Sequence, residues 1–232
     1  MMIPSKTIRE IQRRGMQMVI GIVMILLPIQ AQALVGIGVT GKVGTTGLGA
    51  DLTVPLISNW VNLRGGYNLM ELRPSLTEGD IKYKGDLHLE SIPILLDLHP
   101  FHGNFRITGG AYLNKNEIDL SSIVDASTVG QSGLGVGNAS LNANVSWSND
   151  FAPYFGIGYG NAADDNTLDL PIALGLSIDV GAFYMGSPDV LLSESTGTVS
   201  AADLEAERAQ LEDGLSGLKF FPVITIGIHI RF

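Results

Sequence analysis

The last twelve residues of the chain constrain its fold more than any other segment. Apolar residues occupy every second position there: Ile224, Ile226, Ile228, Ile230 and Phe232. The positions between them hold Thr225, Gly227, His229 and Arg231. Because successive side chains of a strand point to opposite faces, this pattern predicts a strand with one apolar face and one polar or small face. The rest of the chain has to supply the sheet to which this strand belongs.

The first 33 residues have the composition of a secretory signal. Residues 1–17 are basic, residues 18–29 form an apolar run, and Ala31-Gln32-Ala33 provides small residues at a cleavage position. The apolar run is too short for a spanning helix, which needs about 20 residues. We therefore predict that residues 1–33 are a cleaved signal peptide and that residues 34–232 form a single domain.

The composition of residues 34–232 excludes several kinds of function. This part of the chain holds ten Lys and Arg against 22 Asp and Glu, an acidic balance that argues against binding nucleic acid. It has no cysteine, so it has neither disulfides nor thiolate metal sites. We expect no cofactor and no metal. After residue 33 no apolar run is long enough for a spanning helix, so a membrane-crossing form would have to be a closed β-barrel.

Alternating segments that could build such a barrel recur along the chain. They cover residues 35–43, 48–56, 61–69, 87–98, 105–113, 153–159, 168–180 and 221–232, and the sixth could start as early as Ser140. In the fourth segment Leu87 and Leu89 share a face, and the apolar face then changes to Ile92 and Ile94, so we predict a β-bulge near Ser91–Pro93. The fold class expected is all-β, a transmembrane antiparallel up-and-down barrel. Eight strands are predicted, or ten if residues 114–150 hide another hairpin.

A soluble barrel of the lipocalin type is the alternative, with its apolar face buried inside. The polar faces of these segments, however, are rich in Gly, Ala, Ser and Thr, which suit a narrow interior. The apolar faces are rich in Leu, Ile and Val, and tyrosines such as Tyr112, Tyr154 and Tyr159 lie near strand ends, where aromatic girdles would lie. The membrane barrel is therefore favoured.

Several stretches resemble small OmpA-like outer-membrane proteins. They are residues 153–160 (PYFGIGYG), Gly186-Ser187-Pro188 and the C-terminal segment 221–232. The resemblance implies a monomer in the outer membrane of a Gram-negative bacterium, in contact with outer-membrane lipid. It also implies that Phe232 is part of the signal read by the barrel-insertion machinery. We expect no peptidoglycan-binding domain after the barrel, so the resemblance is not expected to extend to anchoring on the cell wall.

One segment does not fit a strand. Residues 200–218 consist largely of strong helix formers, with a capping pattern at Ser200 and Asp203 and glycines at its end. We predict a short helix before the last strand. Either it packs over the barrel mouth as part of an outer loop, or it binds a partner.

The candidate functional residues are the charged side chains on the inward faces of the predicted strands. They are Lys42, Asp51, Arg64, His88, Glu90, Asp97, Arg106, Asp179, His229 and Arg231. Buried charges must pair, so these residues are predicted to form a network that fills the barrel. The function expected is structural or loop-mediated binding. A narrow pore and a lipid-modifying enzyme are the alternatives, the enzyme resting on His88 and Glu90 as a base and its orienting carboxylate.

Overall fold

The computed structural model describes residues 36–73, 75–78, 81–125, 127, 129, 137–163 and 174–231. The predicted signal peptide, Phe232 and the first residues of the predicted strand at 168–180 lie outside this part of the chain. Among the described residues, no helix combines the length and the apolar character needed to cross a membrane.

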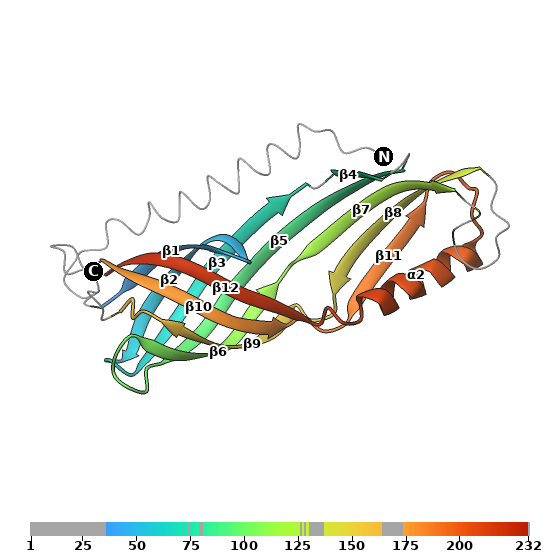
Figure 1. Ribbon diagram of the computed structural model, residues 1–232. Coiled ribbons are helices and arrows are strands. Elements are labelled where there is room, and N and C mark those ends of the chain that lie inside the picture. The colour runs from blue at the N-terminus through green and yellow to red at the C-terminus, as the bar shows by residue number, and fades with distance from the viewer. Residues whose placement is uncertain are drawn as a thin grey trace. The chain divides into compact units, whose positions relative to one another are not determined.

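Eight strands pair in chain order into a closed ring (Figure 1). They are β1 (Gly38–Gly44), β2 (Gly47–Ile57), β3 (Val61–Leu72), β5 (Ile81–Leu98), β6 (Phe105–Asn114), β9 (Phe151–Tyr159), β10 (Leu174–Tyr184) and β12 (Phe220–Arg231). Each is antiparallel to its neighbours, and the ring closes where β12 pairs with β1 and where β5 pairs with β6. The prediction of an antiparallel up-and-down barrel is confirmed.

Four more strands extend the sheet beyond the ring, so that it has twelve strands in the part of the chain that the structure describes. They are β4 (Ser75–Glu78), β7 (Glu117–Asp125), β8 (Asn138–Trp147) and β11 (Pro188–Glu194). The first half of β5 pairs with β7, and β8 and β11 follow in order. We call β7, β8, β11 and this half of β5 the extended sheet. The extra hairpin considered for residues 114–150 exists, but it lies in the extended sheet. Ser140 belongs to β8, so the early start considered for the strand at 153–159 is wrong.

The predicted β-bulge near Ser91–Pro93 is absent. The pairing of β5 with β3 keeps one register from Leu87 to Leu98, and the pairing with β6 is also unshifted. Leu89, Pro93 and Leu95 therefore point into the barrel on the same face as Asp97. The prediction failed because it assumed a polar interior at every level, whereas the interior around Leu95 is apolar.

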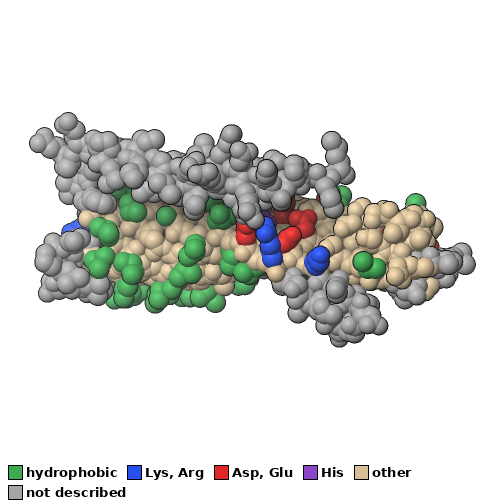
Figure 2. Space-filling view, turned by 90° about the horizontal axis from the view of Figure 1, so that it is seen from above, with side chains coloured by type: hydrophobic (Ala, Val, Ile, Leu, Met, Phe, Trp, Pro, Cys, Tyr) green, Lys and Arg blue, Asp and Glu red, His purple; other side chains and the backbone are tan. Residues whose placement is uncertain are grey.

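The two faces of the barrel wall have opposite character. Inward side chains are mostly polar and buried, while large aliphatic side chains are exposed outside. These exposed side chains form an apolar band on the outer wall, which includes Val43, Leu48, Ile94, Leu96, Ile178, Ile224, Ile226 and Ile228. Hydrophobic side chains cover much of the barrel surface in Figure 2. This is the reverse of a soluble barrel, and it fits a wall that faces hydrocarbon.

Aromatic side chains border this apolar band at both ends of the barrel. Trp60, Phe101 and Tyr159 are exposed at the end that carries the C-terminus, and Phe151 and Phe220 are exposed at the end that continues into the extended sheet. We call these ends the C-terminal end and the extended end. Tyr112 and Tyr154, by contrast, are buried inside the barrel, so their assignment to a girdle is wrong.

Candidate functional site

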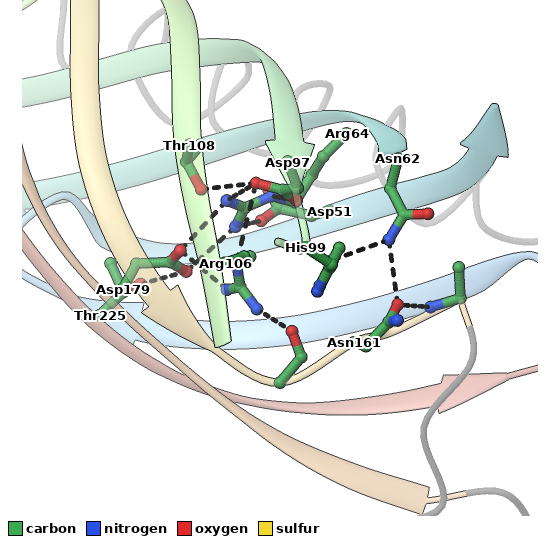
Figure 3. A network of polar contacts seen from close by, with 12 residues as sticks. Asp51, Asn62, Arg64, Asp97, His99, Arg106, Thr108, Asn161, Asp179 and Thr225 are labelled. Atoms are coloured by element: carbon green, nitrogen blue, oxygen red, sulfur yellow. Dashed lines mark hydrogen bonds and ion pairs between the residues drawn. The ribbon is translucent and has the colours of Figure 1, made fainter. Parts of the chain in front are cut away.

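Arg64 is the centre of the polar network inside the barrel (Figure 3). It projects inward from β3 and forms two forked pairs. Its Nε lies 2.9 Å from Asp97 Oδ2 and its NH2 donates to Asp97 Oδ1 at 3.0 Å. NH1 and NH2 donate to the two oxygens of Asp179 at 3.0 and 3.1 Å. NH1 also lies 3.5 Å from Asp51 Oδ2, so one guanidinium joins carboxylates from β2, β5 and β10. This planar five-donor geometry is specific to arginine.

Two further cations complete the network. Lys42 Nζ lies 2.8 Å from Asp51 Oδ1, and Arg106 NH2 lies 2.8 Å from Asp179 Oδ1. Thr108 donates to Asp97 at 2.6 Å. Three cations thus face three carboxylates, and all six of these charged residues are buried. We call the six residues the charge network. Buried ions are costly unless they are paired, and each member of this balanced set has an opposite charge within 3.5 Å.

Glycines on the inward faces make room for these long side chains. A Cβ atom on Gly158 would lie 2.8 Å from Arg106 Nε, and one on Gly66 would lie 1.9 Å from Asp51 Oδ1. The glycines at these two positions, in β3 and β9, therefore have a steric cause. An eight-stranded barrel is just wide enough for side chains to fill, so large and small residues must be matched across it.

An aromatic plug closes the barrel between the charge network and the extended end. Phe183 is fully buried and stacks between Tyr112 and Phe221, with ring centroids 4.7 and 5.0 Å away. Tyr154 packs against Tyr112 at 5.2 Å, and Leu95 belongs to the same cluster. At this level a small, mostly aromatic cluster of buried side chains occupies the barrel.

A third layer of contacts fills the barrel at its C-terminal end (Figure 3). The side-chain amide of Asn62 donates to His99 Nε2 at 3.2 Å and to Asn161 Oδ1 at 3.0 Å. His99 lies in the loop after β5, and its Nδ1 donates to the carbonyl of Gly103 at 2.8 Å. Burial lowers the pKa of His99, which keeps the ring neutral and able to accept from Asn62. The cavity between this layer and Arg64 measures about 10 Å³, room for about one water molecule.

The structure places seven of the ten predicted residues in the buried interior. They are the six members of the charge network and His229. Arg231 is half-buried on the same face of β12 as His229.

His88 and Glu90 lie elsewhere, so their predicted inward position is wrong. They occupy the outward face of β5, where His88 lies 3.6 Å from Glu71 and 3.7 Å from Glu90. Lys115 reaches Glu90 at 3.0 Å. The error arose because the prediction assumed a β-bulge that β5 does not contain. His88 is thus flanked by carboxylates at the surface. A hydrolase would also need a nucleophilic side chain beside this histidine.

Sequence reasoning missed several residues of the interior. Thr108 shares the inward face of β6 with Arg106, but only charged residues were selected as candidates. Asn62, His99 and Asn161 belong to the layer at the C-terminal end. Asn62 could have been found from its inward phase in β3, and His99 and Asn161 from their positions just after β5 and β9. Within the described residues, no group of three or more His, Cys, Asp or Glu side chains could hold a metal ion.

The predicted helix is present as α2 (Ala201–Leu215), capped by Ser200, whose hydroxyl accepts from the backbone N–H of Asp203 at 3.2 Å. Leu211 and Leu215 pack against buried Val145 and Val190 in the extended sheet. The contacts of α2 are thus with the extended sheet, which corrects the expectation of a helix over the barrel mouth. Glu212 accepts a hydrogen bond from the backbone N–H of Val190 at 3.3 Å.

This contact assigns a role to α2. β11 is the last strand of the extended sheet, and a free strand edge is a template for pairing with another chain. The carboxylate of Glu212 accepts from one backbone N–H of that edge, and Arg208 holds Glu212 in place through an ion pair. Replacing Glu212 with Ala should therefore promote self-association of purified protein, measured by light scattering in detergent. Glu207→Ala, on the same helix, is the control. Equal monomer fractions for the two variants would contradict an edge-covering role.

Comparisons with known proteins agree with the fold. No family model matches the sequence, and no curated protein does. Among solved structures, Acinetobacter baumannii CarO2 matches with 24% identity and a TM-score of 0.58, over 87% of this chain and 100% of CarO2. Acinetobacter baumannii CarO matches with 25% identity and a TM-score of 0.56, over 84% of this chain and 97% of CarO. CarO is an outer-membrane β-barrel, so these similarities support an outer-membrane β-barrel. They do not extend to the narrower OmpA-like resemblance.

Proposed function

We propose that the protein is an integral outer-membrane β-barrel of a Gram-negative bacterium with a closed interior, whose role is structural or depends on binding by the extended sheet. The observation that carries this proposal is the filling of the barrel at three successive levels. Polar contacts around His99 fill the C-terminal end, the charge network fills the middle, and the aromatic plug around Phe183 fills the extended end.

Support for the membrane location comes from the outer wall. The exposed aliphatic band would be unstable in water, and aromatic residues border it at both ends. β9 has nine residues, Phe151–Tyr159, so its eight steps cover about 26 Å along the strand, or about 20 Å along the membrane normal when the strand is tilted. That height is close to the apolar band of about 25 Å in outer-membrane barrels.

A conductance measurement tests the closed interior. The protein, extracted in detergent from membranes of cells expressing the full sequence, should give no steady openings in a planar bilayer. The reason is that an ion would have to displace paired charges and then cross an apolar plug. A general porin inserted in the same bilayer is the control for detection, and heat-modifiable migration on a gel verifies folding. Steady, reproducible openings of the folded protein would overturn the proposal and favour the narrow pore.

A further inference from the structure

A polar groove of about 400 Å³ lies on the extended sheet. Its volume is within the range of about 300–1,000 Å³ that small-molecule sites occupy. Cross-strand register aligns the side chains of the groove in two rows on one face of the sheet. The first row consists of Leu191, Asn144, Asp119 and Asp86, and the second of Ser193, Asn142, Ser121 and Lys84. The groove thus presents two parallel rows of mostly polar side chains to a ligand.

The sheet that carries the groove is held in place from its other side. Val145 and Val190 are buried on the opposite face, where Leu211 and Leu215 of α2 pack against them. In Figure 1, α2 runs beside β11, the last strand of this sheet. A backbone fixed by strand pairing and by a helix loses little freedom when a ligand binds, so little affinity is lost to ordering the groove.

The charges in and beside the groove balance. Asp86 and Asp119 are the two carboxylates of the groove, and Lys84 is its ammonium group. Asp86 lies 3.4 Å from Nε of Arg73, so its charge is compensated beside the groove. The two charges that remain, on Asp119 and Lys84, are of opposite sign. A balanced surface steers neither polyanions nor polycations toward itself, so the groove suits an uncharged polar ligand.

The side chains of the groove match hydroxyl groups. Asn144 donates to Asp119 Oδ1 at 2.8 Å, which orients both side chains. An amide has two N–H donors and an acceptor oxygen, and a carboxylate has two oxygens, so this one bond leaves both groups able to bind a ligand. Leu191 is 66% exposed and offers an apolar contact. The groove therefore suits a molecule with adjacent hydroxyls and an apolar C–H face, which is the chemistry of a sugar ring.

We propose that this groove binds an uncharged oligosaccharide. Asp119 and Asn144 hold adjacent hydroxyls of one ring, and Leu191 contacts a C–H face. Neighbouring strands lie about 4.8 Å apart and the two rows about 7 Å apart, which is the scale of a single ring. The inference rests on the binding role proposed for the extended sheet and deepens it by naming a ligand class. It holds whichever side of the membrane the sheet faces, because recognition depends only on the side chains of the groove.

An array of immobilised oligosaccharides tests the proposal, with uncharged glucans, mannans and galactans beside sulfated and phosphorylated ones. The protein is extracted from membranes of cells expressing the full sequence, in a detergent without a sugar headgroup, so that the detergent does not compete. The wild-type protein should bind uncharged members of the array in preference to anionic ones. Calorimetry with the best-bound uncharged oligosaccharide then measures the affinity.

Variants locate the binding in the groove. Asp119→Ala and Asn144→Ala should each weaken binding of that oligosaccharide at least about tenfold, because each removes hydrogen bonds to its hydroxyls. Asp213→Ala removes an exposed carboxylate from α2, and Asn104→Ala removes an amide at the C-terminal end of the barrel. Both of these controls should bind like the wild type. Heat-modifiable migration verifies that every variant is folded.

Three results would overturn the proposal. One is no binding of any uncharged oligosaccharide by folded protein, and another is equal binding by the wild type and both groove variants. The third is stronger binding of the anionic members of the array, because recognition would then depend on charge. The conductance of the same preparation is an independent readout. A silent barrel without saccharide binding would refute only the groove, whereas steady openings would refute the closed interior.

Discussion

Replacing Arg64 with Met should lower the free energy of unfolding by about 3–5 kcal/mol, because one partner is removed from a buried ion network. Asp51, Asp97 and Asp179 would then face only Lys42 and Arg106, leaving a negative charge without compensation in the interior. Urea unfolding of the protein in detergent, followed by tryptophan fluorescence, measures the effect. An acquired pore is not expected, because the aromatic plug remains.

Matched variants separate this effect from the loss of any arginine. Arg73 has a side chain that is 65% exposed and contacts Asp86 at 3.4 Å, so Arg73→Met should change stability by at most about 1 kcal/mol. Arg64→Lys keeps the charge but loses the two forked pairs, and should fall between Arg64→Met and the wild type. In the double variant Arg64→Met/Asp179→Asn, part of the lost stability should return because a carboxylate is neutralised. An effect of Arg64→Met no larger than that of Arg73→Met would contradict the central role of Arg64.

The sequence pattern predicted that the strands have two faces of opposite character, and this was enough to find the barrel. The period of two placed Arg64, Arg106 and Asp179 on inward faces, and burial of each follows from that phase. Which of them meet depends on the register between strands, and register is not encoded in the alternation of a single strand. The double fork of Arg64 on Asp97 and Asp179 was therefore beyond sequence reasoning.

Several of the errors share one cause, the assumption that the interior is polar throughout. That assumption turned Leu89 outward, required a bulge that β5 does not have, and moved His88 and Glu90 inside. It also assigned Tyr154 to a girdle, whereas Tyr154 lies in the aromatic plug. Alternation predicts two faces but does not say which face is apolar at each level of the barrel.

The extended sheet was unpredictable for a different reason. The apolar residues of β7 and β8 do not alternate cleanly, as the run Ser121-Ser122-Ile123-Val124 in β7 illustrates. Their pairing with the first half of β5 depends on β5 being long enough, at 18 residues, to serve both the barrel and the extension. In the sequence, a strand of that length resembles a loop followed by a membrane strand.

Replacing Phe183 with Ala should lower the free energy of unfolding by about 3–5 kcal/mol, the usual cost of removing a fully buried aromatic ring. Phe183 fills the centre of the aromatic plug between Tyr112 and Phe221, and the rigid barrel wall would prevent the cavity from collapsing. Urea unfolding in detergent measures this loss. The same variant should raise the probability of brief openings in the planar bilayer, since the plug is the apolar barrier to ions.

The conservative substitutions Phe183→Leu and Phe155→Leu separate the contribution of ring packing to stability from the contribution of apolar character. The two residues lie on neighbouring strands, but Phe183 is fully buried, whereas Phe155 is 68% exposed on the outer wall. Leucine is nearly as apolar as phenylalanine, so Phe155→Leu should change stability by less than about 0.5 kcal/mol, as a surface substitution does. Phe183→Leu loses its ring stacking and should cost about 1–2 kcal/mol. Equal losses at the two positions would mean that the aromatic residues inside the barrel are packed no more tightly than those facing lipid, and the closed interior would lose its main physical support.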